Sequence, residues 1–552
     1  MRRKSIFVLI LCAMVLSVMA QNSPPQWVQE LQRLNADIID SIVAGEPDED
    51  APQYDSYLIY YHQPLSHANP QGAQFPMRAL LTVDNRKDPT TAVNHVFFSG
   101  YNIDRDYIDD PTALLRAGGC SSEIALRYQA NYIQPEHRYF DYSAPDQCWT
   151  NLDYCTAAEA TEDFHALFEA LKKVFKGKWA ISGVSKGGIT TAIQHTYHPE
   201  DADIFLPYSA PFFDTDRDTV MQQYWYNNGW SKEFRDMFMA IRQTAIQNNE
   251  TIYPIYEKMN AGNDNSKAHL DSIFGMYLSS IASFGFDEHA YGDTTKIREQ
   301  ITTNDYILRA NNLTYGDTVY AFMIEKETFS LNKFQPWIDT LRKYPDPKQG
   351  PARVEHRRLH LPFGITEQEW KSGSDAVPIT AYTYQAKCEL GYYDYRFDEI
   401  VGKERAAEWN AYLKRYGCYL DLMTPYFASI TFNLSLYDRV NNTTQSATKP
   451  LVFIYGEDDT WTGAAMKDAF INGTNVCKFI LPAQNHMVSF SSNTDQAQCD
   501  AIRAILDNVL GAPQGIEEIT NDQSPITNKT IINGHLIIIR NNERYDITGK
   551  KL

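Results

Sequence analysis

The sequence predicts an α/β fold in which a mostly parallel sheet carries helices on both faces. Short apolar runs alternate with amphipathic runs of helical length between about residues 92 and 211, and the alternation resumes at residue 449. Strands that alternate with helices are typical of parallel sheets. Residues 212–448 lack this alternation, so we expect one α/β domain that is interrupted by a large, mostly helical insertion.

Residues 21–211 carry the first part of the expected domain. A short amphipathic helix is expected over residues 25–45, and an antiparallel hairpin is expected from YDSYLIYYHQPL and FPMRALLTV. The next expected elements are the strand AVNHVFFSG, the helix SSEIALRYQ and the strand NYIQPEHRYF. The segment TAAEATEDFHALFEALKKVF predicts a helix, because Thr156 and Glu159 form a capping box and its apolar residues make one stripe. ADIFLPYSAP closes this part as a strand.

The insertion, residues 212–448, contains three segments of helical pattern joined by polar connectors. These segments are SKEFRDMFMAIRQTAIQ, FGMYLSSIASFGF and ERAAEWNAYLKRYG. Residues 449–511 then complete the domain with the strands KPLVFIYGEDD and VCKFILP and the helix DQAQCDAIRAILDNVL. We expect the insertion to cover the carboxyl edge of the sheet.

Residues 512–552 form a linker followed by a short β tail. The β runs in KTIINGHLIIIRNNERYDITG meet at Asn533-Gly534, a dipeptide that favours a hairpin turn. A tail of this size buries too little surface to fold stably alone. We therefore expect it to dock on another surface or to act as a sorting signal.

The N-terminus and the net charge limit the location and the partners. Arg2, Arg3 and Lys4 precede the apolar run IFVLILCAMVLSVM, and small residues follow up to Ala20, a pattern typical of a secretory signal peptide over residues 1–20. The run is shorter than the roughly 18–20 residues of a membrane span, so no span is expected in the mature chain. A net charge of −19 without a basic run argues against nucleic-acid binding.

Cysteine usage agrees with export. Seven cysteines follow the signal segment, and pairing of nearest neighbours in the sequence would join 148 to 155, 388 to 418 and 477 to 499 and leave Cys120 free. Other pairings stay open, because spacing alone does not fix connectivity. CxxC and HExxH are absent from the sequence, so neither a metal nor another cofactor is expected.

The segment GVSKG (183–187) lies directly after the apolar run WAISG and directly before a helical pattern. It is an instance of G-x-S-x-G, in which a tight turn exposes a serine hydroxyl at the carboxyl edge of a sheet. An ordinary glycine-rich turn would look the same. The motif gains weight only if Ser185 has a base and a carboxylate as partners.

Both partners can be found at the ends of later strands. His486, in PAQNHMVSF, follows the strand CKFILP and is the histidine best placed as a base. The strand LVFIY ends in Glu457, Asp458 and Asp459, and the shorter aspartate side chains fit a tight strand end better than the glutamate. A helix N-cap is the other use of an aspartate there.

Ser185, Asp459 and His486 follow one another in the chain order of α/β-hydrolases, each at the end of a strand. The sequence thus predicts an α/β-hydrolase fold with a helical cap insertion and a short C-terminal β tail. In such a triad the histidine takes the proton of the attacking serine and the aspartate orients the imidazole. The backbone N–H groups of Lys186 and of Tyr101, in SGYNID, are the expected oxyanion donors.

The motifs resemble those of a known family. WAISGVSKGG (179–188) resembles the serine-bearing turn of the secreted bacterial serine tripeptidyl aminopeptidases, and YGEDDTW resembles their acid loop with its aspartate at Asp459. EHRYF (136–140) and QAKCELGYY (385–393) are also similar to segments of that family and of its prolyl-carboxypeptidase and dipeptidyl-peptidase relatives. The resemblance covers roughly residues 50–510. Thr460 departs from it, since relatives usually carry proline there.

The resemblance implies an exported serine peptidase that releases short peptides, in particular tripeptides, from the free N-terminus of peptide substrates. Such an enzyme must hold an α-ammonium group at a fixed distance from Ser185, and Glu389 and Glu136 are the candidate carboxylates. A structural salt bridge is the alternative role of each. The tail resembles short C-terminal β segments of proteins exported by Gram-negative bacteria, which leaves periplasmic, cell-surface and extracellular locations open.

Three alternatives remain at this stage. A carboxylesterase or lipase would share the triad, but it would more often show a histidine-glycine oxyanion motif and an apolar lid. The insertion here is rich in tyrosine and charged residues, which favours a polar peptide. A catalytically inactive binding module or a glycan-binding surface protein would leave the intact Ser185, Asp459 and His486 unexplained.

Overall fold

The protein is described here by a computed structural model. It divides into two units, residues 1–505 and residues 506–552, and each is described by itself. The residues described are 24–145, 152–216, 218, 220, 221, 224, 377–392, 430–493, 495–513, 526–532, 535–540 and 543–545.

The first unit is built on a nine-stranded sheet with the order β1-β2-β3-β5-β4-β6-β7-β8-β9. β1 through β3, and the junction of β3 with β5, are antiparallel, whereas the pairs from β5 through β9 are parallel. The strands are β1 (Ile39–Ala44), β2 (Tyr54–Pro64), β3 (Gln74–Asp84), β4 (Asn94–Phe98), β5 (Asn131–Pro135), β6 (Trp179–Val184), β7 (Ile204–Tyr208), β8 (Leu451–Gly456) and β9 (Val476–Leu481). The expected α/β fold and the expected hairpin of β2 and β3 are confirmed.

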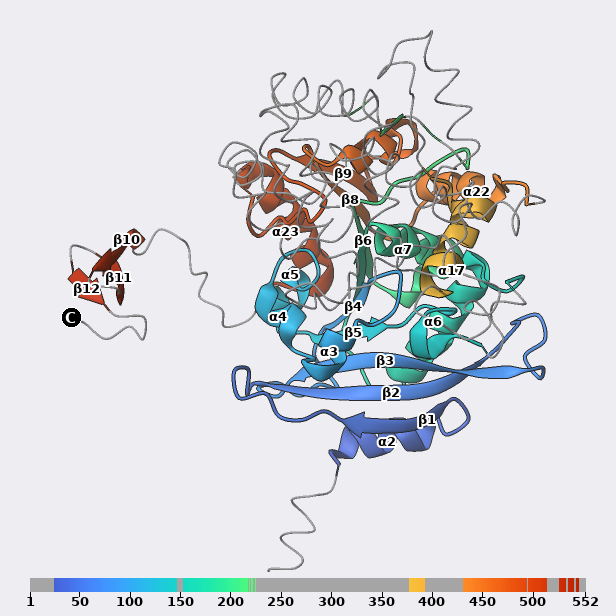
Figure 1. The fold of residues 1–552 in the computed structure, drawn as a ribbon, viewed down its shortest axis with the longest axis horizontal. Helices are drawn as coiled ribbons and strands as arrows, with labels where there is room; N and C mark the ends of the chain where they lie inside the picture. Colours follow the sequence, from blue (N-terminus) through green and yellow to red (C-terminus); the bar gives the residue numbers. More distant parts are fainter. Residues whose placement is uncertain are drawn as a thin grey trace, which may run out of the picture. The chain divides into compact units, whose positions relative to one another are not determined.

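Helices cover both faces of the parallel part of the sheet (Figure 1). α6, α7, α17 and α22 lie on one side, and α3, α4 and α5 lie on the other. The helices are α2 (Gln26–Leu34), α3 (Arg105–Asp109), α4 (Ala113–Ala117), α5 (Glu123–Tyr128), α6 (Ala157–Lys172), α7 (Lys186–Tyr197), α17 (Val377–Gln385), α22 (Ser435–Gln445) and α23 (Gln496–Leu510). Side chains of α2, α6, α7 and α22 join those of the strands in one buried core.

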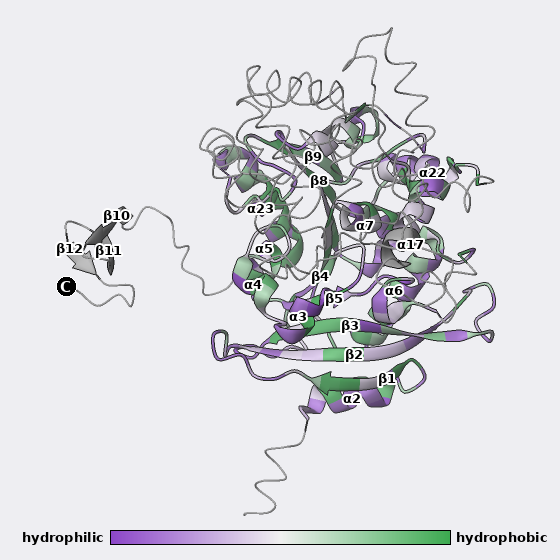
Figure 2. Ribbon diagram, in the orientation of Figure 1, coloured by the Kyte–Doolittle hydropathy of each residue, from purple (hydrophilic) through white to green (hydrophobic). Residues whose placement is uncertain are grey.

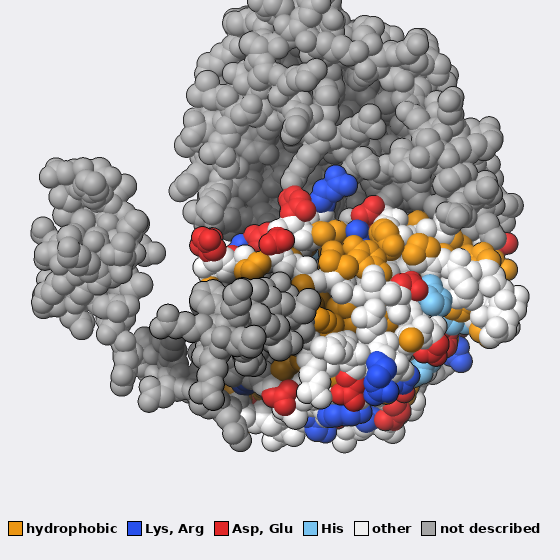
Figure 3. Space-filling view, turned by 90° about the horizontal axis from the view of Figure 1, so that it is seen from below, with side chains coloured by type: hydrophobic (Ala, Val, Ile, Leu, Met, Phe, Trp, Pro, Cys, Tyr) orange, Lys and Arg blue, Asp and Glu red, His pale blue; other side chains and the backbone are white. Residues whose placement is uncertain are grey.

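The hydropathy of each element follows this packing. Figure 2 shows the hydrophobic residues of β3 and β8 inside the molecule, while α2 and α6 also carry hydrophilic residues. On the face in Figure 3, Lys and Arg side chains are interspersed with Asp and Glu side chains, and hydrophobic side chains gather in one area. The described part of that face has no continuous basic surface of the kind that binds nucleic acid.

The N-terminal end of α6 forms only half of the expected capping box. Thr156 Oγ1 accepts a hydrogen bond from the Glu159 N–H at 3.2 Å, as expected of an N-cap. The Glu159 carboxylate accepts hydrogen bonds from His67 N–H at 2.8 Å and from Ser66 Oγ at 3.3 Å. Glu159 thus ties the loop between β2 and β3 to α6.

Two expected elements were wrong in extent. The helix expected over residues 25–45 ends at Leu34, and residues 39–44 form β1. The Asn35 side chain closes the helix by donating to Leu31 O at 2.9 Å and to Ala170 O at 3.0 Å. The segment IDSIVA is rich in β-branched residues, which fit a strand that pairs with β2.

The strand expected over NYIQPEHRYF ends at Pro135. The residues after it leave the sheet because their side chains bind elsewhere. The Arg138 Nε donates to Asp163 Oδ2 on α6 at 2.6 Å, and both side chains are fully buried.

The described parts of the insertion include helices. They include α17, which continues into a π-helical turn, η7 (Ala386–Leu390), and α22. The three helices expected from the sequence lie outside the described residues. In the second unit, β10 (Ile526–Ile532) pairs antiparallel with β11 (His535–Arg540), so the expected hairpin is confirmed, and β12 (Glu543–Tyr545) adds a third strand.

No disulfide is found among the described residues. The five cysteines among the described residues are unpaired: Cys120, Cys155, Cys388, Cys477 and Cys499. The pairing of Cys477 with Cys499 was wrong, because nearness in the sequence does not bring β9 and α23 side chains to bonding distance. Cys148 and Cys418, the expected partners of Cys155 and Cys388, lie outside the described residues. In the described part of the chain, every helix is too short or too polar to cross a membrane.

Candidate active site

Ser185 lies at the sharp turn between β6 and α7. Its backbone has φ 59° and ψ −122°, a region that residues other than glycine rarely adopt. The Ser185 N–H donates to Tyr208 O at 3.0 Å, and its C=O accepts from the Ile189 N–H at 3.0 Å. The expected strand–turn–helix around the serine is confirmed, and its strain is typical of a nucleophile elbow.

The glycines of GVSKGG are required by close backbone contacts. A Cβ atom on Gly187 would lie 1.9 Å from Phe98 O at the end of β4, and one on Gly183 would lie 2.4 Å from Gly187 O. A Cβ atom on Gly188 would lie 2.4 Å from Tyr208 O. The first turn of α7 therefore packs directly on the ends of β4 and β7.

Asp459 and His486 form a buried pair. The Nδ1 atom of His486 lies 2.8 Å from Oδ2 of Asp459, and the two residues are almost completely inaccessible to solvent. The other carboxylate oxygen, Oδ1, accepts from the Trp461 N–H at 3.0 Å. One aspartate thus fills both roles considered from the sequence, the partner of the histidine and the cap of the turn Thr460–Ala464.

The turns that carry Ser185 and His486 are linked through the end of β7. Ser185 N–H is bonded to Tyr208 O, and the hydroxyl of the next residue, Ser209, donates to His486 O at 2.9 Å. β6, β7, β8 and β9 are neighbours in the parallel part of the sheet, so their carboxyl ends share one edge. The structure brings the turns of Ser185, Asp459 and His486 to this edge.

The two N–H groups expected to bind the oxyanion differ in their present hydrogen bonds. The Lys186 N–H is the first of α7 and therefore has no acceptor within the helix. The Tyr101 N–H already donates to Ser99 Oγ at 3.2 Å. In the free protein the Ser99 hydroxyl therefore accepts from this N–H, and the oxyanion role of Tyr101 stays a prediction.

The side chain of Lys186 is buried behind the turn. Its ammonium group donates to Gly100 O and lies 5.4 Å from the ring centroid of Tyr101 and 5.0 Å from that of Phe140. Burial lowers the pKa of Lys186 to about 7, although nearby Cys155 and Glu389 act to raise it. No local sequence pattern predicts that this lysine is buried.

Glu136, one of the two candidates for binding a substrate ammonium, is committed to the fold. Oε1 accepts from Arg78 Nη2 at 2.8 Å and from Ile103 N–H at 2.9 Å, and Oε2 accepts from Ser143 N–H at 3.0 Å and from Ser143 Oγ at 2.8 Å. Its side chain is fully buried. The candidate role of Glu136 was therefore wrong, and the salt-bridge alternative holds.

Glu389, the other candidate, lies on η7 and is only half-buried as a residue. Its Oε1 accepts from the Ala157 N–H at 2.6 Å, at the start of α6. Burial of the carboxyl group raises the pKa of Glu389 to about 7, although the Ala157 hydrogen bond and the Lys186 charge act to lower it. Glu389 also lines a small pocket with Ile189 and Phe213.

One residue that supports the loop after His486 was not foreseen. Glu123, at the start of α5, accepts from Ser489 Oγ at 2.7 Å and from Ser491 N–H at 2.9 Å, which holds the loop after His486. Burial raises the pKa of Glu123, although these hydrogen bonds act to lower it. In the sequence, Glu123 is an ordinary acidic residue in the first turn of a helix, so no local signal could have found it.

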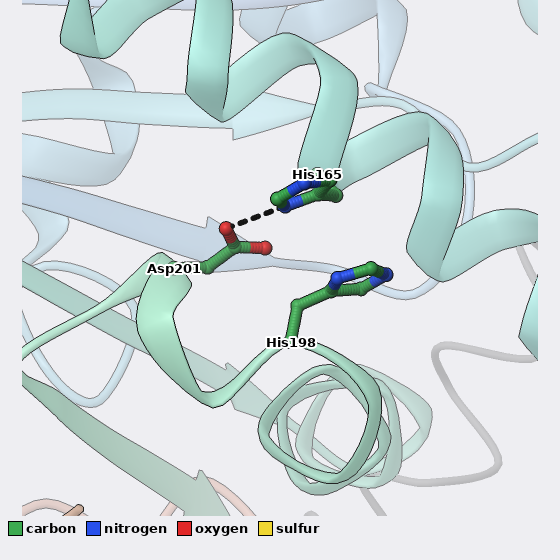
Figure 4. A group of neighbouring side chains, drawn as sticks. All are labelled: His165, His198 and Asp201. Carbon is green, nitrogen blue, oxygen red and sulfur yellow. Dashed lines mark hydrogen bonds and ion pairs between the residues drawn. The ribbon is translucent and has the colours of Figure 1, made fainter.

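A cluster of possible metal ligands lies at the other end of α7. His165, His198 and Asp201 have ligand atoms within 4.8 Å of one another, and Figure 4 shows the two imidazoles stacked beside the carboxylate. His165 Nδ1 lies 2.8 Å from Asp201 Oδ1, and the two rings are 4.1 Å apart at 7°. His198 Nε2 lies 3.0 Å from Glu162 Oε1, so both rings bind protein carboxylates.

Comparisons with known proteins identify similar peptidases. Residues 35–307 match the family model described as PS-10 peptidase S37. The chain is 23% identical over 540 residues to a prolyl tri/tetrapeptidyl aminopeptidase of Streptomyces mobaraensis, and the match covers 95% of this chain and 96% of that protein.

Solved structures resemble the chain only distantly. A proline iminopeptidase of Mycobacterium smegmatis has 13% identity and a TM-score of 0.29, covering 85% of this chain and 97% of its own. The rice cell wall degrading esterase LipA of Xanthomonas oryzae has 10% identity and a TM-score of 0.33, covering 86% of this chain and 98% of its own. These scores are too low to bear on function. From its family match, its curated relative and its own sheet and turns, the chain is a serine peptidase of the α/β-hydrolase fold, related to peptidase family S37.

Proposed function

We propose that this peptidase releases short peptides, and in particular tripeptides, from the free N-terminus of peptide substrates through an acyl-enzyme. One observation carries the proposal: the buried Asp459–His486 pair at 2.8 Å lies on the sheet edge that also holds the strained turn of Ser185. A buried pair of this kind fixes an imidazole as a general base. The family match supports the peptidase class, and the name of the relative supports the proposed N-terminal specificity.

In the proposed reaction, Ser185 Oγ attacks the carbonyl carbon of the scissile bond and His486 takes the serine proton. The carbonyl oxygen becomes an oxyanion, which the Lys186 N–H stabilises. His486 then gives the proton to the leaving amine, and the peptide stays on Ser185 as an ester. Water, deprotonated by His486, attacks this ester, and the released peptide leaves as a carboxylic acid. His486 returns the proton to Ser185 Oγ, and Asp459 supports the charged imidazole in both steps.

The relative named a prolyl tri/tetrapeptidyl aminopeptidase supports two finer proposals for the substrate. The first is that three or four residues are released, and the second is that proline stands before the scissile bond. Both describe the relative by its name and are here proposals for this chain.

We propose Glu389 as the carboxylate that binds the substrate α-ammonium group. Of the two acids considered, Glu136 has both oxygens filled by protein donors, whereas Glu389 is half-buried and lines a pocket with Ile189 and Phe213. A carboxylate at a fixed place would select a free N-terminus over an acetylated one by a charge-assisted hydrogen bond.

We further propose that residues 1–20 are removed during export and that the mature enzyme works in the periplasm, at the cell surface or outside the cell. The charged start, the short apolar run and the small residues up to Ala20 support this location. Mass spectrometry of the secreted protein tests it, and a mature N-terminus at Gln21 is the expected result.

The activity is tested with residues 21–552 and chromogenic amides of free and N-acetylated tripeptides and dipeptides, alongside a p-nitrophenyl ester. Turnover restricted to unblocked tripeptides is the expected result. Ester turnover without any amide cleavage would instead indicate the carboxylesterase. Ser185→Ala is expected to abolish turnover and leave the protein folded, because the hydroxyl contributes chemistry and little packing.

A further inference from the structure

The backbone loop that faces the Ser185 turn is held by the side chain of the residue after the serine. Gly100 lies in this loop with φ +83°, and a Cβ atom there would lie 2.6 Å from the Gly187 N atom. The loop therefore packs against the first turn of α7. The buried Lys186 ammonium donates to Gly100 O in the same place.

Gly100 C=O and Tyr101 N–H belong to one peptide unit. The described residues contain no cis peptide bond, so the two groups point in opposite directions from a rigid plane. A donor that fixes the C=O therefore also fixes the direction of the N–H. Lys186 Nζ donates to the C=O at one edge of this peptide plane. Ser99 Oγ accepts from the N–H at the opposite edge, at 3.2 Å.

The rest of Tyr101 is fixed as well. Its C=O accepts from the His137 N–H at 3.0 Å, and its ring lies 5.7 Å from Phe140 and 5.6 Å from Tyr382 at steep angles. The Gly100–Tyr101 plane is thus left with one adjustable feature. That feature is its rotation between the lysine and the serine hydroxyl.

We propose that the Lys186 side chain is a positioning residue for the oxyanion hole, which orients the Gly100–Tyr101 peptide so that the Tyr101 N–H can serve as the second donor. This inference rests on the proposed acyl-enzyme function and deepens it. Residue 186 then contributes twice: its own N–H binds the oxyanion, and its ammonium aims the other N–H. On this view, the hydrogen bond to Ser99 Oγ is exchanged for one to the oxyanion during attack.

The role predicts a specific kinetic change. Oxyanion donors stabilise the transition state more than the bound substrate, so their loss lowers kcat and leaves KM nearly unchanged. In Lys186→Met, the apolar chain fills the same space without a donor. We expect kcat to fall about 10- to 100-fold, with KM within about twofold of the wild type.

A peptide boronic acid provides the readout that a purely structural role would not change. Its adduct with Ser185 is tetrahedral and places an oxygen where the oxyanion forms, so its affinity should fall by the same factor as kcat. Lys186→Gln keeps one donor and should lie between the wild type and Lys186→Met in both measurements. Lys387→Met is the matched control and should retain kcat. It removes a lysine of η7 that is paired with Asp216.

The outcomes are separable. Wild-type kcat and boronate affinity in Lys186→Met, or a rise in KM at constant kcat, would overturn the positioning role. If Lys186→Met does not fold, Lys186→Gln is compared with the wild type, and the same parallel loss is required. Turnover that survives Ser185→Ala would instead overturn the proposed acyl-enzyme function.

Discussion

At the scale of single residues, the site combines strain and restraint. Ser185 holds a backbone conformation that costs of order 1–3 kcal/mol, and its backbone bonds to Tyr208 and Ile189 help to hold it there. Asp459 sits at the end of β8 with one oxygen on Trp461 and the other on His486. The geometry of the site is therefore fixed by neighbours that take no part in the chemistry.

The strain at Ser185 predicts a stabilising substitution that removes activity. Ser185→Gly should raise the free energy of unfolding by about 1 kcal/mol relative to Ser185→Ala, because glycine adopts φ near 59° without a Cβ penalty. Urea unfolding followed by circular dichroism measures the difference. Ala192→Gly, within α7, is the control and should be destabilising, and equal stability of the two Ser185 variants would contradict the prediction.

Thr460 predicts a second stabilising change. It is the first residue of the turn Thr460–Ala464, a position that accepts proline, and Asp459 before it is extended at φ −87° and ψ 121°, as a residue before proline should be. Its buried hydroxyl has no hydrogen-bond partner among the described residues. Thr460→Pro should therefore raise stability by about 0.4–1 kcal/mol and leave kcat unchanged. A lower melting temperature by calorimetry would show the turn to be incompatible.

At the scale of elements, side-chain hydrogen bonds hold α6 at its N-terminal end and at its middle. Thr156 and Glu389 accept hydrogen bonds from N–H groups of its first turn, and His165, at its middle, binds Asp201 in the short turn after α7. Asp201 Oδ2 also accepts from Gln194 Nε2 at 2.6 Å. These contacts join α6 to α7 beneath the serine turn.

The His165–Asp201 contact predicts a pH dependence of stability. The hydrogen bond to Asp201 raises the pKa of His165, with smaller contributions from the charges of Asp201, Glu169 and Glu162. A raised pKa means that the contribution is full below the ordinary histidine pKa of about 6.5 and is lost as the pH rises through the folded-state pKa.

The comparison is between the wild type and His165→Asn from pH 5.5 to 8.5. The stability advantage of the wild type should shrink across this range, and it should be small because the imidazole is about a third exposed. His62→Asn, which alters another exposed histidine–aspartate contact, serves as a control for general effects of pH. An advantage that grows with pH would contradict the assignment.

The sequence predicted elements best where the pattern was local. Ser185, Asp459 and His486 could be located because each follows an apolar strand, and the order of strands then places them at one edge. β1 was mistaken for helix because its pairing with β2 depends on residues 13 or more positions away. The roles of Glu136, Glu123 and the Lys186 side chain depend on distant partners, which no local pattern records.

At the scale of the whole first unit, the insertion contacts the sheet domain at the start of α6. Glu389, from the insertion, caps α6 of the sheet domain through the Ala157 N–H, and its charge attracts that of Lys186 beside Ser185. The acid proposed to bind substrate is therefore in electrostatic contact with the residue that follows the nucleophile.

This arrangement predicts how substrate affinity varies with pH. The pKa of Glu389 is raised to about 7, so the carboxylate loses its charge as the pH falls through that value. If it binds the substrate ammonium, KM for unblocked peptides should rise about tenfold for each unit below pH 7. Steady-state kinetics from pH 5.5 to 8.5 measure this. Glu389→Gln should have a high KM with little pH dependence, and an unchanged profile in that variant would exclude Glu389 as the anchor.

The two oxygens of Asp459 have a practical consequence. An asparagine in its place would keep one acceptor for the Trp461 N–H, so the turn would retain its shape, while the imidazole would be held in the wrong tautomer. Asp459→Asn should thus yield a protein that accommodates intact peptide but turns it over about ten-thousandfold more slowly. Crystals soaked with uncleaved peptide would then show how many substrate residues lie between the amino terminus and the scissile bond.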